Sequence, residues 1–353
     1  MSVEDVVAAI APADPVAGEA ARLRHERLTK PPGSLGRLEE LSLQVAAIQR
    51  DECPAIRGKA VVVAAGDHGV VAQGVTGYPQ EVTAQMVLNF LSGGAAISVM
   101  ARRAGVKLLV VDAGVATALP EHPDLRVVGV GRGTADMTLG PAMSREQAEA
   151  CVLAGVGLAR EVAATGADAI GTGDMGIGNT TASSAITAAV TGRSPHETTG
   201  RGTGRNDEEL AAKAAVVERA LAVNDPDAGD GLDILAKVGG FEIGVLAGVV
   251  LGGAIERRVV VLDGFISGAA ALIAHRLCPT VVDYLVASHL SAEAGHRLAL
   301  SHMGLRPLLD LGMRLGEGTG AVLAMGLVEA AAACLSEMAT FDEAGVSGAE
   351  SAD

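Results

Sequence analysis

The sequence predicts an α/β fold in which helices cover a mostly parallel sheet and a small helical domain is built from both termini. Three observations lead to this prediction. Apolar runs rich in Val, Ile and Leu recur, Ala-rich helical segments separate most of them, and both chain ends are rich in Ala and Glu without such runs. Continuous apolar runs suit strands buried on both faces, and their alternation with helices is typical of a parallel sheet.

The expected strands lie in apolar runs, most of which close on a Gly or Asp cluster. These runs are residues 59–69, 107–114, 125–134, 167–176, 257–265 and 280–289. The main intervening helices are expected at residues 81–104, 144–165 and 207–223. Ligands of open α/β sheets bind beyond the carboxyl ends of the strands, so the functional site is expected at that edge.

The chain is long enough for one large domain and a smaller one. We expect residues 55–305 to form the large α/β domain, which carries the active site. Residues 1–54 and 306–353 lack strand-like runs and are expected to form the small helical domain together.

Composition narrows the class of protein. A formal net charge of −15 argues against nucleic acid as a partner, since phosphate backbones require basic surface. The four cysteines are dispersed without a C-x-x-C pair, which fits neither a zinc site nor a disulfide framework. The N-terminus lacks the order of a signal peptide, and no long apolar stretch is free of charges and loop signals. We therefore expect a cytoplasmic protein without a membrane partner.

One glycine-rich stretch, GTGDMGIGNTTASS at residues 171–184, follows an apolar run and precedes a helix-compatible segment. It contains G-x-G-x-x-G, but no strand ending in an acidic residue follows about 20 positions on, as a dinucleotide site requires. A G-x-x-x-x-G-K-[ST] phosphate loop is absent as well. A tight turn and an anion site formed by backbone N–H groups before a helix both remain open.

The anion interpretation has several candidate donors. They are the backbone N–H groups of Gly176, Gly178, Asn179 and Thr180, with the hydroxyls of Thr180 and Thr181, which are also expected to cap the helix. A second loop, GRGTGRND at residues 200–207, adds further N–H groups, and Lys213 adds a positive charge. Two glycine loops and a lysine suit a phosphate monoester.

Two other stretches carry charged candidates. RLGEGTG at residues 314–320 places Glu317 between two glycines, where a carboxylate is either accessible to a ligand or simply exposed. AGDHG at residues 65–69 suggests a metal through Asp67 and His68, but adjacent strand residues point to opposite faces and no H-x-x-H or H-x-E lies nearby. We expect neither a metal nor a cofactor.

Several long motifs, taken together and in order, resemble one known family over nearly the whole chain. They are KPPGSLGRLEEL (30–41), DHGVVAQGV (67–75), PQEVTAQMVLNF (79–90), GDMGIGNTT (173–181), KVGGFEIG (237–244), LDGFISGAAAL (262–272), SHLSAEAGH (288–296) and MRLGEGTGAVLAM (313–325). The family is that of the nicotinate-nucleotide:dimethylbenzimidazole phosphoribosyltransferases, which act in the assembly of the lower loop of cobalamin (vitamin B12).

The resemblance implies a Rossmann-like parallel sheet, a small helical bundle from both termini and a homodimer. It implies transfer of phosphoribosyl from nicotinate mononucleotide to 5,6-dimethylbenzimidazole, which gives α-ribazole 5′-phosphate and nicotinate. Glu317 matches the family's catalytic base, and Asp174 is a second catalytic candidate. The substrate-binding candidates are Gly176, Gly178, Asn179, Thr180, Thr181, Gly202, Gly204, Lys213, Asp263, Ser291, Leu315, Gly316, Tyr78, Gln85 and Met86.

The sequence departs from the family pattern at two places. Asp174 stands where the family commonly has Glu, which is one methylene longer. Residues 78–86, where the benzimidazole is expected, read YPQEVTAQM, whereas some relatives have Ser and other residues there. The alternatives are therefore the same reaction with adenine, another benzimidazole or a phenolic acceptor, an NAD-type oxidoreductase, and a non-catalytic binder of nucleotides or azoles.

Overall fold

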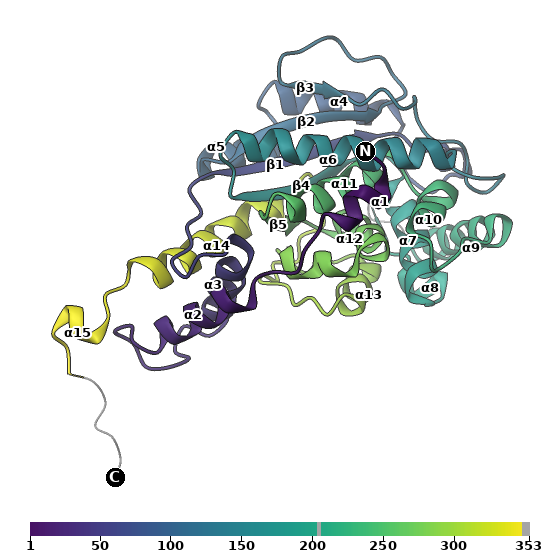
Figure 1. The fold of residues 1–353 in the computed structure, drawn as a ribbon. Helices are drawn as coiled ribbons and strands as arrows, with labels where there is room; N and C mark the ends of the chain where they lie inside the picture. Colours follow the sequence, from purple (N-terminus) through teal and green to yellow (C-terminus); the bar gives the residue numbers. More distant parts are fainter. Residues whose placement is uncertain (203–205, 348–353) are drawn as a thin grey trace.

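The computed structural model describes residues 1–202 and 206–347, and its centre is one parallel sheet (Figure 1). The strand order is β3-β2-β1-β4-β5-β6, and each neighbouring pair is parallel. The strands are β1 (Lys59–Gly66), β2 (Lys107–Gly114), β3 (Leu125–Val127), β4 (Ala169–Met175), β5 (Val259–Leu262) and β6 (Leu285–Ala287). The chain order reverses between β1 and β4, which is where open α/β sheets bind ligands.

The predicted α/β fold is confirmed, but several expected strands are shorter than their apolar runs. The run 125–134 gives only three strand residues, and Gly129, two residues after the strand ends, adopts φ 72°. The first part of the run 280–289 forms a 3₁₀ helix, η2 (Pro279–Tyr284), which begins with a proline that cannot donate to a sheet ladder.

Helices cover both faces of the sheet. Helices α6 (Arg145–Ala164), α11 (Phe241–Ile255) and α12 (Phe265–Leu277) pack on one face, and α4 (Glu81–Leu91), α5 (Ala96–Ala104) and α14 (Thr319–Glu337) pack on the other. The helices near the sheet's carboxyl edge are α7 (Asn179–Thr191), α8 (Pro195–Thr198), α9 (Asp207–Asn224), α10 (Gly231–Val238) and α13 (Ala294–His302), and η1 (Gly69–Gln73) follows β1.

The helix expected at residues 81–104 is two helices. Gly93 adopts φ 78° and separates α4 from α5, so the chain turns between them. This segment and α14 are each long and apolar enough to cross a membrane by length and composition alone. Both pack against the sheet, and more than half of the apolar window of α14 is buried, as in the core helix of a globular domain.

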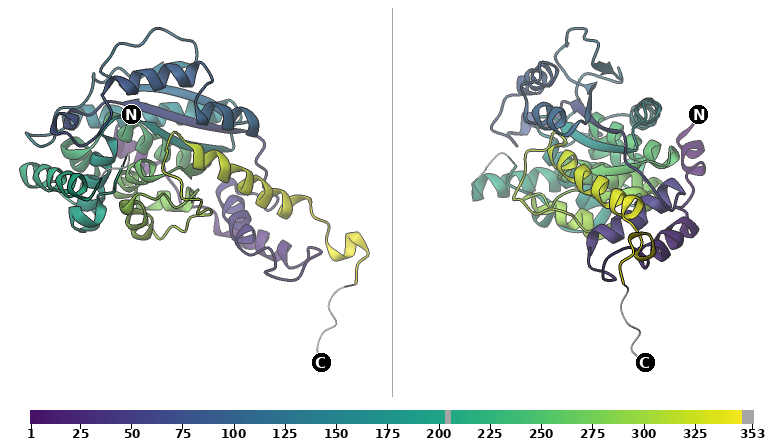
Figure 2. Two further views of the ribbon diagram at one scale, coloured as in Figure 1. Left: turned by 180° about the vertical axis from the view of Figure 1, so that it is seen from behind. Right: turned by 90° about the vertical axis from the view of Figure 1, so that its left-hand side faces the viewer.

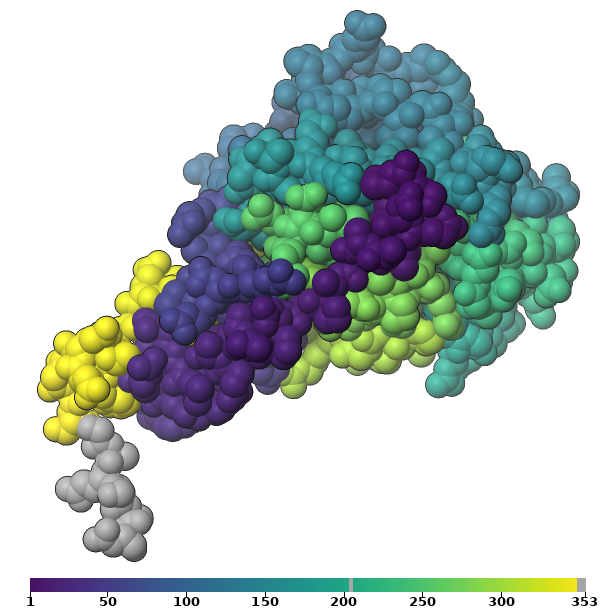
Figure 3. Space-filling view, viewed as in Figure 1, coloured from purple at the N-terminus to yellow at the C-terminus, as the bar shows by residue number. Residues whose placement is uncertain are grey.

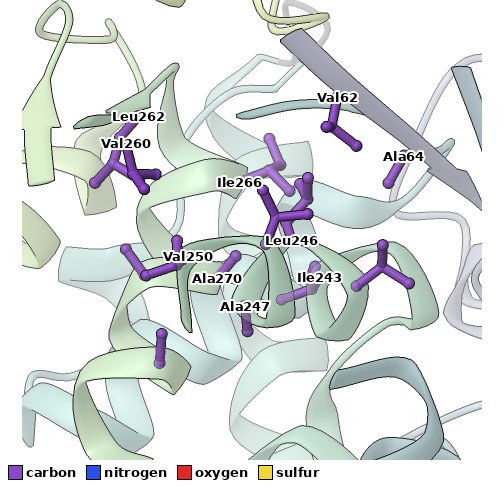
Figure 4. Packing of buried hydrophobic residues seen from close by; sticks show 14 of the residues in the cluster. Val62, Ala64, Ile243, Leu246, Ala247, Val250, Val260, Leu262, Ile266 and Ala270 are labelled. Carbon is purple, nitrogen blue, oxygen red and sulfur yellow. The ribbon is translucent and has the colours of Figure 1, made fainter. Parts of the chain in front are cut away.

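Part of the buried core lies between β1 and the central helix α11. Figure 4 shows Val62 of β1 near Leu246 of α11, with Ala64 and Ile243 alongside. These four side chains are fully buried. Gly155 of α6 lies directly against α11, where a Cβ would overlap a backbone carbonyl, so α6 and α11 pack closely. The closely packed layer fixes the strands whose ends carry the site.

Segments from the two chain ends lie side by side (Figures 2 and 3). Helices α2 (Pro15–His25) and α3 (Arg37–Gln49) pack against α14, and Leu28 pairs with Thr340 just before α15 (Phe341–Ala344). The first helix, α1 (Val3–Ala8), instead packs against α6 and α11 on the sheet. Helix α14 therefore contacts both the sheet and the terminal helices.

Candidate active site

A pocket of about 470 Å³ lies at the carboxyl ends of the central strands. Two of its walls are the loop after β4 and the segment before α14, which the sequence singled out as glycine-rich. The walls also include the N-terminus of α12 and the start of α4. The pocket is therefore at the edge where the fold class predicted a site.

The first two glycines of the G-x-G-x-x-G stretch serve packing. A Cβ on Gly173 would lie 2.6 Å from the carbonyl oxygen of Glu317, and a Cβ on Gly171 would lie 2.9 Å from the Met325 methyl. Both glycines therefore let the start of α14 approach β4. The pattern has a structural cause, which weakens the dinucleotide alternative.

The rest of the stretch forms the N-terminus of α7. Gly178 is the N-cap residue and adopts φ 97°, which only glycine adopts readily. Gly178, and neither Thr180 nor Thr181, therefore caps the helix, so that expectation was wrong. A Cβ on Gly178 would lie 2.8 Å from Val71 as well, because the loop rests on η1.

Lys213 extends from α9 to this helix terminus. Its Nζ donates to the Thr180 hydroxyl at 2.7 Å and to the Gly200 carbonyl at 3.4 Å. The side chain is buried, yet it lines the pocket beside Gly202. A buried ammonium next to a helix N-terminus is an arrangement suited to an anion.

Glu317 lies in an unusual backbone segment. Its φ is 64°, and the glycines on both sides also have positive φ, 79° and 90°. A non-glycine residue in this region is strained, and such strain is found at functional sites. The side chain is 5% exposed, and its Oε2 has no hydrogen-bond partner among the described residues. Burial raises the pKa of Glu317, and a backbone hydrogen bond from Ile97 opposes this.

Asp174 is the second carboxyl of the pocket. Its Oδ2 accepts from the Asn179 amide at 2.9 Å, whereas Oδ1 has no partner in the described chain. Burial raises the pKa of Asp174 well above its usual value, and the carboxylates of Asp263 and Glu242 raise it further. The backbone of Asp174 accepts the N–H of Glu317 at 3.2 Å, so the two candidates belong to one unit.

Asp263 lies behind the pocket wall. Its carboxylate accepts backbone N–H groups at the start of α14, from Gly318 at 2.9 Å, Gly320 at 2.7 Å and Ala321 at 3.2 Å. It is fully buried and does not line the pocket. Its observed contacts therefore fix the helix that follows Glu317.

Asp67 and His68 each contact other residues of the protein. His68 Nε2 lies 2.7 Å from Glu242 Oε1, and Asp67 Oδ2 accepts the Ala116 N–H at 2.8 Å. Glu242 raises the pKa of His68 against the effect of its burial. Within the described residues no group of three or more His, Cys, Asp or Glu side chains could hold a metal ion.

The structure gathers most of the predicted residues around the pocket. Those lining it are Tyr78, Met86, Asp174, Gly176, Gly178, Asn179, Thr180, Gly202, Lys213, Ser291, Leu315, Gly316 and Glu317. Gln85, Thr181 and Asp263 do not line it, and Gly204 lies outside the described residues.

Other pocket residues were missed by the sequence reasoning. Those with polar side chains are Thr76, Glu293 and Arg314, and the apolar ones are Val75, Val82, Met175, Ile177, Phe265 and Ile266. His289, which the sequence places at a strand end, also lines the pocket. Phe265 and Ile266 follow Gly264 directly after β5, so their place at a strand end was a usable signal. Arg314 opens the same motif that contains Glu317.

Comparisons with known proteins agree with this geometry. A family model described as phosphoribosyltransferase matches residues 10–346. The chain is 58% identical to the nicotinate-nucleotide–dimethylbenzimidazole phosphoribosyltransferase of Roseiflexus sp. (strain RS-1), over 98% of each chain. It is 55% identical to that of Desulforudis audaxviator (strain MP104C), over 97% of each.

A solved structure agrees as well. The enzyme of this name from Thermus thermophilus superimposes with a TM-score of 0.91 at 52% identity, covering 95% of this chain and all of that one. The family match spans nearly the whole chain, including every segment that lines the pocket. The chain therefore belongs to the nicotinate-nucleotide–dimethylbenzimidazole phosphoribosyltransferase family.

Proposed function

We propose that this chain transfers the 5-phosphoribosyl group of nicotinate mononucleotide to 5,6-dimethylbenzimidazole, giving α-ribazole 5′-phosphate and nicotinate for cobalamin biosynthesis. The observation that carries the proposal is the joint presence, in one pocket, of a buried carboxylate on a strained loop and a lysine at a helix N-terminus. The first supplies a base and the second binds a phosphate.

The chemistry requires one base and good alignment. Nicotinate leaves readily from the mononucleotide because its ring nitrogen is already positively charged. An imidazole nitrogen of the acceptor attacks C1′ from the opposite face, which inverts the configuration from β to α. Glu317 takes the proton from the other nitrogen, and a positioned base of this kind contributes ~10²–10⁴-fold. Holding both rings in line contributes further through orientation.

The phosphate belongs at the N-terminus of α7. Lys213 supplies a charge there, and the backbone N–H groups of Gly176, Gly178 and Thr180 supply donors. The N–H of Asn179, which the sequence also suggested as a donor, instead donates to the Gly176 carbonyl at 3.1 Å. Glu293 lies at the same end, where its Oε2 closely approaches Gly200 and has no hydrogen-bond partner in the described chain. A carboxylate oxygen there is suited to accept a ribose hydroxyl.

The acceptor base belongs at the apolar end of the pocket. Val75, Val82 and Met86 line this wall, and Tyr78 stands at its edge with 53% of its surface exposed. An apolar wall fits a flat methylated ring and supplies few hydrogen bonds by which to select one acceptor. Acceptor choice is therefore the finer property that experiment has to assign.

We propose that the active form is a cytoplasmic homodimer that acts on small molecules, without a nucleic-acid or membrane partner. Support for a dimer comes from apolar side chains exposed on helices that pack on one another. Leu88 on α4, Val99 on α5 and Leu323 on α14 are each 41% exposed. A second copy of the chain would cover such a surface.

The decisive experiment is an acceptor competition. Nicotinate mononucleotide is incubated with equal concentrations of dimethylbenzimidazole, adenine, an unsubstituted benzimidazole and a phenol, and the products are identified by chromatography and mass. We expect α-ribazole 5′-phosphate to dominate. Another dominant product would change the acceptor, and no transfer product with any base would overturn the proposal. An absorbance change on adding NAD and a hydroxy acid would favour the oxidoreductase instead.

A further inference from the structure

Arg314 is a pocket cation to which the mechanism above gives no role. Its Nη1 donates to the carbonyl oxygen of Gly202 at 3.0 Å, and its side chain lines the pocket. Gly202 also lies against Lys213, because a Cβ on this glycine would be 3.2 Å from Nζ. The guanidinium and the ammonium therefore both lie beside one residue of the pocket wall.

Arg314 and Lys213 together match the charge of a phosphate monoester better than either cation does alone. A phosphate monoester carries about −1.5 to −2 charges at neutral pH and has three acceptor oxygens. Arg314 forms no ion pair within the described chain, and Gly202 uses only one of the five N–H groups of its guanidinium. The remaining N–H groups can bind phosphate oxygens in the planar geometry that arginine provides.

Arg314 and Glu317 lie on one short segment that is fixed at both ends. The Met313 carbonyl, just before the segment, accepts the N–H of Ala292 at 3.0 Å. The Gly318 N–H, just after it, donates to Asp263 at 2.9 Å. Residues 314–317 span the interval, and Glu317 has its strained φ of 64° within it. A displacement of the Arg314 side chain can therefore be transmitted to Glu317 along this short, restrained segment.

We propose that Arg314 binds the 5′-phosphate of the mononucleotide and that this contact positions Glu317 for proton abstraction. The inference rests on the proposed function. In the step, the bond from C1′ to the nicotinate nitrogen breaks, the bond from C1′ to the acceptor nitrogen forms, and the acceptor proton goes to Glu317. Arg314 exchanges no proton. Binding energy from the phosphate, which does not react, is used to orient the reacting groups.

The first test compares Arg314→Ala with Arg306→Ala. Arg306 is an exposed arginine on the same connection and pairs with Glu40, outside the pocket. We expect Arg314→Ala to lower kcat/KM for the mononucleotide by about 10- to 100-fold, with part of the loss in kcat, because one charged hydrogen-bonding contact is removed. Added guanidinium should restore part of kcat, and Arg306→Ala should behave like the wild type in every assay.

The second test removes the phosphate from the substrate instead. Nicotinate riboside should be a poor donor for the wild type, and added phosphite should raise its kcat. In Arg314→Ala this activation by phosphite should be lost. A residue that only stabilises the fold would not alter activation by a free anion, and equal melting temperatures of the two variants would exclude unfolding as the cause.

Each contrary result would reject a specific part of the inference. Wild-type kinetics and intact phosphite activation in Arg314→Ala would overturn the inference, and a loss confined to KM would overturn the positioning of Glu317. Binding of ribose 5-phosphate, followed by calorimetry, tests the phosphate contact without any transfer reaction. If no variant or wild type transfers phosphoribosyl but Arg314→Ala still weakens this binding, the proposed function fails and the phosphate contact stands.

Discussion

Glu317 combines a strained backbone with a buried carboxylate, and the two features have one consequence. The left-handed conformation directs the side chain from a tight segment between glycines, where few neighbours can hydrogen-bond it. Its raised pKa means that the charged form is disfavoured in the folded protein. An ionised, incompletely paired carboxylate is a stronger proton acceptor. The arrangement therefore lowers the stability of the folded protein and raises the reactivity of Glu317 as a base.

Glu317→Gln tests this exchange. We expect turnover to fall by ~10²-fold or more while binding of the mononucleotide is nearly unchanged, because only the base is lost. When a carboxyl has a higher pKa in the folded state than in the unfolded state, the protein loses stability as pH rises through the folded-state pKa. The variant should therefore melt at the same or a higher temperature at pH 7. Turnover within a factor of about three of the wild type would remove Glu317 from the mechanism.

The pH profile of the wild type provides a related measurement. A base acts only when deprotonated, so kcat should fall as pH drops through the pKa of Glu317 in the complex. Because burial raises that pKa above its ordinary value of 4.5, the acid limb should have its midpoint above pH 4.5. An acid limb with its midpoint below that value would assign the base role to another group.

The side chain of Asp174 is one methylene shorter than the glutamate that the family commonly has, so its contact with substrate can be tested by lengthening it. A short carboxylate at this place can also serve to cap the following turn instead of contacting substrate. The Asp174 carboxylate accepts from the Asn179 amide and does not cap α7, whose N-cap is Gly178, so the structure does not support a capping role. We expect Asp174→Glu to keep or raise kcat/KM, since the longer side chain restores the reach of the family's glutamate. Asp174→Ala is the comparison and should lower it. A drop of several degrees in melting temperature with unaltered kinetics in Asp174→Glu would contradict substrate contact.

At the scale of elements, strand β4 and helix α14 form one unit. The missing side chains of Gly171 and Gly173 create the space in which α14 begins, and Asp263 holds that beginning by three backbone hydrogen bonds. Glu317 lies just before this helix, next to its N-cap residue Gly318. The position of the proposed base is thus set by strand packing.

Gly173→Ala and Gly171→Ala distinguish packing from cofactor binding. The Gly173 methyl would meet the backbone of Glu317, which cannot easily move, whereas the Gly171 methyl would first meet a flexible methionine end. We expect Gly173→Ala to cost about 1–3 kcal/mol of stability and to lower kcat, and Gly171→Ala to have the smaller effect on both. Equal kinetics in the two variants would show that Glu317 does not depend on this contact.

At the scale of the whole molecule, α14 connects two packing environments. Its first turns lie against β4 and β5 beside the pocket, and it also packs on α2 and α3 from the other end of the chain (Figure 2). The exposed faces of α4, α5 and α14 surround this connection and carry the apolar side chains that favour a second copy.

Sedimentation tests the proposed dimer. We expect the wild type to sediment at twice the mass of the 353-residue chain. Val99→Glu should shift it toward monomer, because a charge buried at an interface is costly without a partner. Val223→Glu is a matched control, since Val223 is 50% exposed on α9, away from this face. A monomeric wild type, or equal dissociation of both variants, would contradict the proposed interface.

Local patterns determined the architecture. Continuous Val and Ala runs such as residues 59–66 are typical of doubly buried strands, and alternation with helices favours parallel connections. The glycines around residue 317 marked a segment of unusual backbone, because glycine spacing is a local property. The family motif identified Glu317 as a candidate base, and the second glycine loop, with Lys213 in the helix that follows it, indicated a phosphate.

Only the tertiary structure decided how separate segments meet. Nothing local to Asp263 indicates that its carboxylate accepts N–H groups from residues more than 50 positions away. Likewise, G-x-G-x-x-G has the local form of a nucleotide loop, whereas Gly173 is required by the carbonyl of Glu317. Arg314 joined the pocket through its contact with Gly202. Such contacts depend on how the chain packs over long separations, which a local pattern does not encode.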